Sequence, residues 1–236
     1  MATETSMTPS RLAFIPARGG SKRVPRKNIK HFFAQPMISW PIRAAIDSQA
    51  FRSVVVSTDD SEIAEISSRF GAEVIFRDAE LSDDFTHTTS VLKDCIRQVI
   101  KPDDNPWVYK IYPTTPASPQ ELLDFVSFTE LEAFGLSVSV ARSGDPVQRA
   151  LVMNPGNVIR FREPEYALTR TQDLEPVYFD AGKMYGGRKS DWLETETPLL
   201  SSARGFELPE WLSVDMDTIE DWELAEYKFK RKFGTN

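Results

Sequence analysis

Short apolar runs and helical patterns alternate along the first part of the chain, and this alternation limits the folds open to it. Runs rich in Val, Ile, Phe and Tyr predict strands at 11–16, 53–57, 73–76, 107–112 and 135–141. Between them, apolar residues at helical spacing predict helices at 37–48, 61–70, 87–101 and 119–132. We therefore predict an α/β fold with a doubly wound, mostly parallel sheet, which binds ligands beyond the carboxyl ends of its strands.

A stretch from about 142 to 190 breaks this alternation. It mixes prolines and glycines with short apolar runs and many charges, so it is either an inserted β-hairpin subdomain or a long functional loop region. After it, residues 211–214 are predicted to form a short strand. A final helix is then expected to begin at a cap formed by Asp217 or Thr218, with a charge order that complements the helix dipole.

The composition is typical of a compact soluble enzyme. A chain of 236 residues can bury a substantial core, so we expect one domain over 11–236, preceded by a disordered polar leader at 1–10. No apolar run approaches the ~20 residues that cross a bilayer, so no membrane span is expected. The single Cys95 excludes an internal disulfide and is typical of the reducing cytoplasm. A net charge of −7 argues against nucleic-acid binding.

A basic segment with two glycines follows the first predicted strand. Residues 15–28 read Ile-Pro-Ala-Arg-Gly-Gly-Ser-Lys-Arg-Val-Pro-Arg-Lys-Asn, a dense group of cations in an acidic chain. Gly19 and Gly20 lack a Cβ, so the backbone can approach a ligand closely. Backbone N–H groups and long cationic side chains together form a receptor for polyphosphate, although the segment matches neither the ATPase phosphate loop nor the dinucleotide fingerprint. The alternative is a solvated basic turn or a general polyanion patch.

Asp215 and Asp217 precede the last predicted helix. If residues 211–217 stay extended, both carboxylates project from one face, roughly 7 Å apart at their Cα atoms. Such a pair can hold Mg²⁺, with water and phosphate oxygens completing the octahedron. The alternative is a capping arrangement, and Asp217 could serve both purposes. The position of the pair after a strand, in a chain with a phosphate-type loop, favours the metal.

Other polar residues are weaker candidates. Arg77 follows a predicted strand and could reach a nucleotide, although a surface cation is the alternative. Asp83 and Asp84 are candidate caps for the next helix. His31 and His87, the two histidines, lie far apart in the sequence without a plausible triad, and we interpret both as structural.

Taken in order, these segments resemble the signature of the cytidylyltransferases that activate nonulosonic (sialic-type) acids with CTP. The ending Pro25-x-Lys27-Asn28 favours the acylneuraminate branch over the related 3-deoxy-manno-octulosonate (KDO) branch, which usually has Pro in place of Asn28. Residues 82–84 and the Tyr112-Pro-Thr motif are most similar to pseudaminic acid cytidylyltransferases. The resemblance covers nearly the whole chain and continues through 36–38, 54–60, 63–65, 71–73, 77–84, 112–116, 180–182 and 215–217.

The resemblance implies a Rossmann-like nucleotidyltransferase fold with CTP bound over the basic segment. The family's metal-binding Asp-x-Asp falls on Asp215 and Asp217, so Mg²⁺ is the expected cofactor. In the family, the region corresponding to 142–190 supplies homodimer contacts and part of the sugar site, so a small inserted dimerisation subdomain is expected here. The expected nucleotide contacts are Ala17, Arg18, Gly19, Gly20, Ser21, Lys22, Lys27, Asn28, Arg77 and Thr88.

An acidic nine-carbon sugar is the expected partner of CTP. Arg170, Gln172 and Asp173 match a family stretch near the acid sugar, and the fork of an arginine fits a carboxylate bidentately. Tyr112 replaces a Gln of many sialic acid enzymes, and with Thr114 it is expected at the sugar, where a phenol is suited to a deoxy sugar with a methyl terminus. The stretch 183–187 departs from the aromatic-rich pattern of pseudaminic acid enzymes, so the particular acid stays open.

The expected reaction is in-line attack of the anomeric hydroxyl on the α-phosphorus of CTP, with release of pyrophosphate. Arg18 and Lys27 are the candidate catalytic cations that neutralise phosphate charge. No dedicated general base is evident, and Asp217 acting through a bound water is one option. The alternatives are a nucleotidyltransferase acting on a sugar 1-phosphate, a sialic, legionaminic or KDO enzyme, and a non-catalytic polyanion-binding module.

Overall fold

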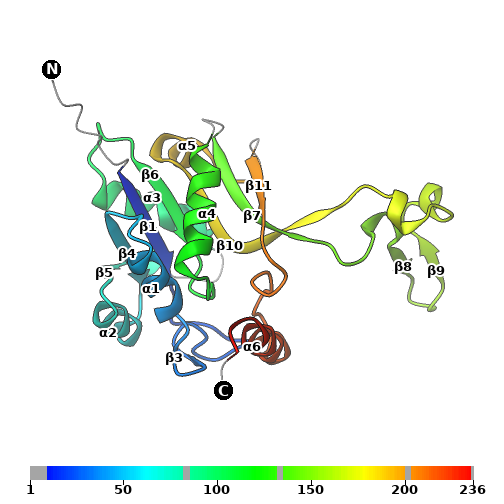
Figure 1. Ribbon diagram of the computed structural model, residues 1–236, viewed down its shortest axis with the longest axis horizontal. Coiled ribbons are helices and arrows are strands. Elements are labelled where there is room, and N and C mark those ends of the chain that lie inside the picture. The colour runs from blue at the N-terminus through cyan, green and yellow to red at the C-terminus, as the bar shows by residue number, and fades with distance from the viewer. Residues whose placement is uncertain (1–9, 82–85, 132–134, 200–202, 235–236) are drawn as a thin grey trace.

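The computed structural model describes residues 10–81, 86–131, 135–199 and 203–234. Within these residues a seven-stranded sheet has the order β11-β7-β10-β6-β1-β4-β5 (Figure 1). Strand β10 runs antiparallel to both of its neighbours, and the other adjacent pairs are parallel. The predicted mostly parallel sheet is thus confirmed. Its strands are β1 (Arg11–Pro16), β4 (Ser53–Thr58), β5 (Glu73–Phe76), β6 (Trp107–Ile111), β7 (Leu136–Arg142), β10 (Tyr178–Arg188) and β11 (Ala203–Glu207).

Helices cover both faces of this sheet. Because successive side chains of a strand point to opposite faces, β1 packs differently on its two sides. Ala13 and Ile15 lie in the core formed with α1, α2 and α4, whereas Leu12 and Phe14 lie in the core formed with α3 and α5. The doubly wound arrangement follows from this division. The helices are α1 (Ser39–Asp47), α2 (Ser61–Arg69), α3 (Thr88–Val99), α4 (Pro119–Glu130), α5 (Lys189–Glu194) and α6 (Ile219–Phe233).

Local signals set the ends of several helices as expected. Gly71, with a φ of +93°, follows α2 and allows the chain to turn away from it. Pro119 occupies the first turn of α4, and Ser118 caps that helix through a capping box with Glu121. Thr218, rather than Asp217, caps α6. The proposed caps Asp83 and Asp84 lie outside the described residues, as does the predicted leader apart from Ser10.

The predicted strand at 211–214 is wrong. The backbone turns there instead, with the Leu212 N–H donating to the Pro209 carbonyl at 2.9 Å. The Trp211 ring packs against Phe229 and Phe233 of α6, with centroids 5.9 and 5.1 Å apart. Aromatic packing onto the helix thus determines this segment, which has no strand partner in the described part of the chain.

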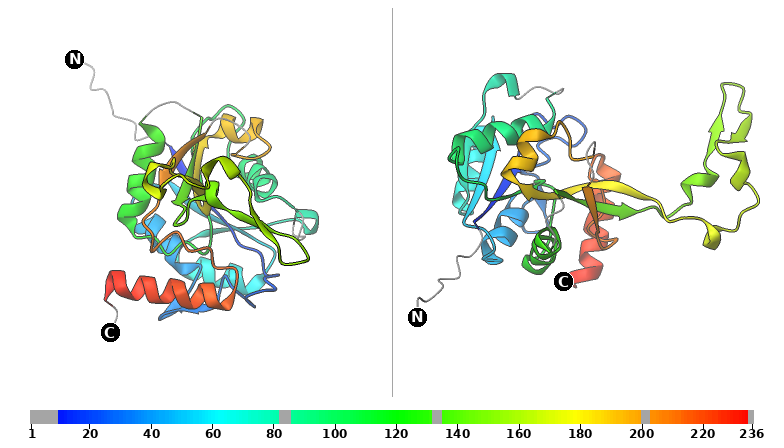
Figure 2. Two further views of the ribbon diagram at one scale, coloured as in Figure 1. Left: turned by 90° about the vertical axis from the view of Figure 1, so that its right-hand side faces the viewer. Right: turned by 90° about the horizontal axis from the view of Figure 1, so that it is seen from above.

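An arm, defined as residues 143–177, leaves the body between β7 and β10 (Figures 1 and 2). It carries the antiparallel hairpin of β8 (Leu151–Met153) and β9 (Ile159–Phe161) together with short 3₁₀ turns. The stretch predicted to be irregular is therefore divided. Its first part is the arm, and its last part contains β10, a central strand of the sheet, and the start of α5.

A third core supports the loop that follows β1. It joins Val24 and Phe32 to Trp222 and Phe229 of α6. Phe32 belongs to a small hairpin of β2 (His31–Phe32) and β3 (Gln35–Pro36), and its ring contacts both α6 aromatics edge-on. This packing fixes the C-terminal part of the basic segment, at Val24, against α6. No described helix combines the length and apolar character of a membrane span.

Candidate active site

A cleft of about 320 Å³ lies beyond the carboxyl ends of β1 and β6, at the edge of the sheet where such folds bind ligands. A larger hollow of about 490 Å³ at the base of the arm is lined by none of the predicted site residues. The predicted residues that line the cleft are Arg18, Ser21, Lys22, Lys27, Asn28, Arg77, Thr88, Tyr112, Thr114 and Asp217.

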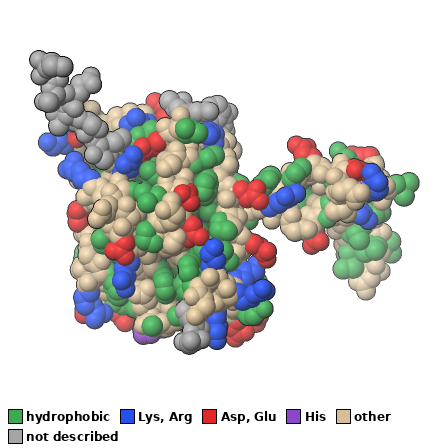
Figure 3. Space-filling model, viewed as in Figure 1, with side chains coloured by type: hydrophobic (Ala, Val, Ile, Leu, Met, Phe, Trp, Pro, Cys, Tyr) green, Lys and Arg blue, Asp and Glu red, His purple; other side chains and the backbone are tan. Residues whose placement is uncertain are grey.

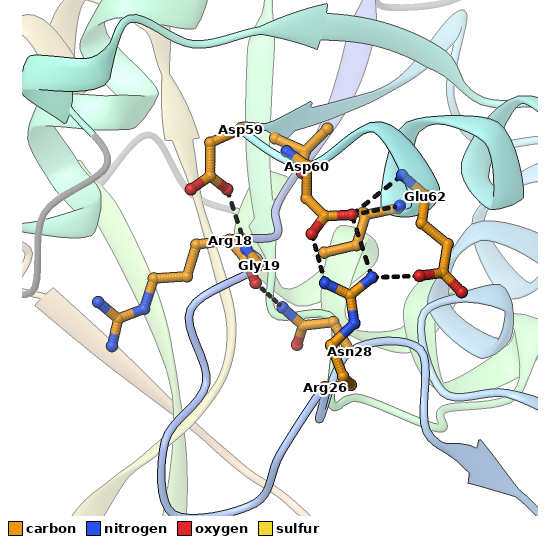
Figure 4. Close-up of polar contacts among 9 residues, drawn as sticks. Arg18, Gly19, Arg26, Asn28, Asp59, Asp60 and Glu62 are labelled. Carbon is orange, nitrogen blue, oxygen red and sulfur yellow. Dashed lines mark hydrogen bonds and ion pairs between the residues drawn. The ribbon is translucent and has the colours of Figure 1, made fainter.

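The basic loop, defined as residues 17–28, is held by carboxylates from the corner between β4 and α2 (Figure 4). The Gly19 N–H donates to Asp59 Oδ1 at 2.9 Å. Arg26, at a φ of +54°, forms ion pairs with Asp60 and Glu62. The hydrogen bond from Arg26 holds the pKa of the Asp60 carboxyl below its ordinary value. The loop is thus preorganised, since its backbone and one of its cations are fixed from outside.

Asp60 also forms the N-terminal cap of α2 at the same corner. Its Oδ1 accepts from the N–H groups of Glu62 and Ile63, each at 3.0 Å, and so caps α2. A carboxylate engaged with both a helix terminus and Arg26 cannot move without breaking both. A Cβ added at Gly19 would lie 2.5 Å from Asp60 Oδ2, which explains why glycine is needed there. Residues 58–60 directly follow the strand predicted at 53–57, but the sequence did not identify them as supports of the loop.

The remaining loop contacts bring it to the chain before α6. Asn28 is buried and donates through Nδ2 to the Arg18 carbonyl at 2.9 Å, which closes the loop. Lys27 Nζ donates to the Met216 carbonyl at 3.0 Å and lies 3.2 Å from Asp217 Oδ1. Arg23 pairs with the other oxygen of Asp217 at 2.7 Å. Ala17, whose N–H donates to Ser57 at 2.9 Å, continues the β1 pairing, and Gly20 lies within the loop.

Asp215 and Asp217 supply the carboxylate oxygens that a hard metal ion prefers, although the strand predicted before them at 211–214 does not form. Asp217 lines the cleft. Asp215 is close enough for its negative charge to act on Tyr112 and Lys183. The capping alternative for Asp217 is wrong, because Thr218 and Asp221 form the capping box of α6. No group of three or more His, Cys, Asp or Glu side chains with metal-binding geometry occurs among the described residues. Substrate and water oxygens would therefore complete the coordination of Mg²⁺.

Arg77 presents a half-buried cation to the cleft. Its guanidinium donates to the Ser57 carbonyl, while its buried Nε has no hydrogen-bond partner in the part of the chain that the structure describes. Burial lowers the pKa of Arg77 from its ordinary value, although an arginine still stays charged. A charged, incompletely bonded guanidinium beside a cleft is suited to an anionic or carbonyl-bearing ligand.

Two buried lysines beneath the cleft were missed by the sequence analysis. Lys110 is 2% exposed and Lys183 is fully buried, and burial lowers the pKa of each to about 8. Lys183 Nζ donates to the Thr114 carbonyl at 3.0 Å, directly under the cleft wall. Lys110 Nζ donates to Thr88 Oγ1 at 3.2 Å. For Lys110, the sequence signal that could have indicated this role was a lysine within the apolar run 107–111.

The structure does not bring Arg170, Gln172 and Asp173 to the cleft of their own chain. They lie at a 3₁₀ turn of the arm, which projects from the body (Figure 2). Arg170 is exposed and pairs with Asp173 at 2.7 Å. The sugar role predicted for these residues therefore needs a route other than the cleft of the same chain.

Comparison with known proteins identifies the family. Residues 12–178, more than half of the chain, match the model of the family described as Cytidylyltransferase. This chain belongs to the cytidylyltransferase family. It is therefore an enzyme that uses CTP, and the resemblance inferred from the motifs is confirmed.

Relatives of this cytidylyltransferase match almost its whole length. The pseudaminic acid cytidylyltransferase of Campylobacter jejuni subsp. jejuni serotype O:2 is 36% identical over 224 residues, covering 93% of this chain and 96% of that protein. The N-acylneuraminate cytidylyltransferase A of Danio rerio is 32% identical over 236 residues, covering 94% of this chain and 51% of that protein.

Solved structures share the fold. A CMP-2-keto-3-deoxy-manno-octonic acid synthetase complexed with CTP matches at a TM-score of 0.66 and 18% identity, covering 95% of this chain and 100% of that one. The 4-diphosphocytidyl-2C-methyl-D-erythritol synthase of Anaerococcus prevotii matches at 0.60 and 14% identity, covering 95% and 97%. The Rossmann-like nucleotidyltransferase fold is thus confirmed.

The contact between Gly19 and Asp60 yields a first prediction. In Gly19→Ala the new Cβ would clash with a carboxylate that is held by both Arg26 and α2, so the loop must shift. We expect the KM for CTP to rise at least tenfold while the thermal midpoint changes little. Gly20→Ala, where a Cβ meets no atom within 4 Å, should have a several-fold smaller effect in the same steady-state assay. Equal effects in the two variants would contradict the proposed role of the contact.

Proposed function

We propose that this cytidylyltransferase transfers CMP from CTP to the anomeric hydroxyl of a nonulosonic acid, with pseudaminic acid as the preferred substrate. The observation that carries the proposal is the cleft itself, in which loop cations face Asp217 beside Tyr112. Support for the acid comes from the relatives, since the pseudaminic acid enzyme of Campylobacter jejuni is 36% identical over nearly the full length.

In the proposed reaction the protein supplies position and charge, and no residue forms a covalent bond. The anomeric oxygen attacks the α-phosphorus of CTP while the bond from that phosphorus to the bridging oxygen of the β-phosphate breaks. Pyrophosphate leaves, and the hydroxyl proton passes to water. Arg18 and Lys27 line the cleft and would stabilise charge that develops on the phosphate oxygens.

Asp215 and Asp217 are the proposed ligands of Mg²⁺. Both supply the carboxylate oxygens that this ion prefers, and Asp217 already faces the phosphate loop. When bound, the ion would neutralise part of the triphosphate charge. Lys27 and Arg23 pair with Asp217 in the structure, and with Mg²⁺ bound at this carboxylate both cations would be available to phosphate.

Tyr112 supports the choice of pseudaminic acid. Its half-buried ring lines the cleft and lies 5.9 Å from the Tyr185 ring. An aromatic face with one hydroxyl is suited to a deoxy sugar with a methyl terminus better than to a polyhydroxylated tail. Discrimination by such a surface is modest, about 10–200-fold.

A substrate panel tests the proposed function. With CTP and Mg²⁺, pyrophosphate release should give its highest kcat/KM with pseudaminic acid, followed by legionaminic acid, N-acetylneuraminic acid and KDO. Arg18→Ala and Lys27→Ala should each lower that value at least tenfold, because a loss of about 1.4 kcal/mol of transition-state stabilisation has this effect. A higher value with N-acetylneuraminic acid would overturn the choice of sugar. Turnover only with sugar 1-phosphates would overturn the reaction class.

Metal dependence gives a separate prediction. Chelation of divalent ions should abolish turnover, and Asp215→Asn and Asp217→Asn should each raise the Mg²⁺ concentration needed for half-maximal rate at least tenfold. Asn keeps the shape of Asp but removes the charge that holds the ion. Asp221→Asn is the matched control, since Asp221 belongs to the capping box of α6 and should affect stability rather than metal dependence. Normal Mg²⁺ dependence in both Asp215→Asn and Asp217→Asn would contradict the assignment of these residues as metal ligands.

We also propose that the protein is a homodimer in which the arm reaches the partner. The arm exposes large apolar side chains at its hairpin and beyond (Figure 3). Such a set is costly to leave in water and is typical of a contact surface. Dimerisation would cover it and would bring Arg170 to the partner's cleft. The exposed fractions are 51% for Leu151, 65% for Met153, 65% for Val158, 57% for Ile159 and 98% for Leu168.

A complementation experiment tests this arrangement. Light scattering should first give about twice 26.8 kDa. Arg170→Ala should reduce kcat/KM for the sugar, and Arg18→Ala should inactivate the cleft. After the two variants are unfolded and refolded together, mixed dimers hold one intact cleft beside one intact arm, so about a quarter of wild-type activity should return. Activity no greater than the sum of the separate variants would show that the arm does not serve the partner.

A further inference from the structure

Lys110 lies in the middle of β6 under the cleft, where the neighbouring strand residues are all buried. Its ammonium is surrounded by aromatic rings, with Nζ 4.0 Å from the Tyr185 centroid, 5.2 Å from that of Tyr112 and 5.8 Å from that of Trp192. No described carboxylate forms an ion pair with it, and Asp180 acts on it only as a more distant charge. Ring faces stabilise such a cation only in part.

Comparison with Lys189 shows that Lys110 differs from a structural buried lysine. Lys189 is also buried, and its Nζ donates to the carbonyl groups of Lys101, Pro102 and Asp104 at 2.8, 2.6 and 2.7 Å. Three acceptors satisfy its three donors. Lys110 has one such partner among the described residues, Thr88 Oγ1 at 3.2 Å. Structural stability alone does not account for a charge held this way.

The contact between Lys110 and Thr88 favours one direction for a hydrogen-bond chain that ends at Tyr112. An ammonium can only donate, so Thr88 Oγ1 accepts from Lys110. Thr88 Oγ1 also lies 3.0 Å from Tyr112 Oη. A hydroxyl that accepts from a cation becomes a stronger donor, which favours the arrangement in which Thr88 donates to Tyr112 Oη. The Tyr112 proton is then left to point into the cleft that its side chain lines.

Tyr185 shows the opposite arrangement. Its hydroxyl donates to the Asp180 carboxylate, with distances of 2.7 and 2.8 Å to the two oxygens, so its proton is already engaged. The two neighbouring phenols therefore have different hydrogen-bonding states. Tyr112 is the one that can offer a proton to a ligand.

We propose that Lys110 is a positioning and specificity-determining residue, which acts through Thr88 to make the Tyr112 hydroxyl a hydrogen-bond donor to an acceptor oxygen of the acid sugar. This inference rests on the proposed function, because it assigns a contact within the same cleft. The acceptor is a carbonyl-type oxygen, which a nonulosonic acid carries both in its carboxylate and in its N-acyl groups.

A double-mutant cycle tests the proposal. Lys110→Met and Tyr112→Phe should each lower kcat/KM for the sugar about tenfold, while the KM for CTP stays within about twofold. Because both changes remove the same donated bond, the double variant should lose no more than either single variant. Lys189→Met, the matched buried lysine, should lower the thermal midpoint without this selective loss. Additive losses, an unchanged sugar kcat/KM or an equal rise in the KM for CTP would overturn the proposal.

A second variant keeps the test decisive if Lys110→Met does not fold. Thr88→Val interrupts the chain while leaving the ammonium in place, and at saturating CTP it should reproduce the loss of kcat/KM for the sugar. Because Thr88 is also an expected nucleotide contact, the KM for CTP is not a criterion for this variant. Inhibition by KDO, which has the carboxylate but no N-acyl group, separates the two acceptors. If KDO inhibits the variants more weakly than the wild type, the carboxylate is the acceptor of the Tyr112 hydrogen bond. If KDO inhibits them equally, the acceptor is an N-acyl oxygen. Failure of the wild-type enzyme with every acid sugar would overturn the proposed function, whereas a normal Thr88→Val variant overturns only the present inference.

Discussion

Carboxylates hold the basic loop from two sides, and the cleft depends on this restraint. Asp59 and Asp60, at the corner between β4 and α2, bind Gly19 and Arg26 of the loop, and Asp217 binds Lys27 from the chain before α6. A loop with so many like charges would otherwise separate them into solvent. The restraint keeps the cations converging on one cleft, and each supporting carboxylate lies at the end of a regular element, where the sheet and the aromatic core fix its position.

The sheet also places two buried lysines beneath the cleft. Central strands β6 and β10 each carry a lysine where an apolar residue would stabilise the core more. The unfavourable burial is visible in the pKa of about 8 for each. Both ammonium groups touch residues that line the cleft, Thr88 in one case and Thr114 in the other. These two buried charges of the central sheet thus lie beside the site.

Most of the sheet could be predicted because strands with Val-rich runs and helices with spaced apolar residues are local patterns. The signal was weaker for β10, where glycines and Lys183 interrupt the pattern, and for β11, whose stretch is short and mixed. The strand expected at 211–214 failed because Trp211 packs onto α6, a contact between distant residues. In the site, the loop cations and the Asp pair could be identified as candidates by residue type and spacing. The roles of Asp59, Asp60 and Lys110 could not, since each depends on a neighbour far away in sequence.

The pairing of Asp217 with Arg23 and Lys27 has a consequence for how strongly ionic strength should affect ligand capture. Cations that already hold a carboxylate keep few mobile counterions around them, so a triphosphate arriving there releases fewer ions than the number of basic residues suggests. Binding of the triphosphate instead replaces ion pairs with Asp217 by ion pairs with phosphate. The affinity for nucleotide should therefore decline less steeply with added salt than the number of basic residues in the loop suggests.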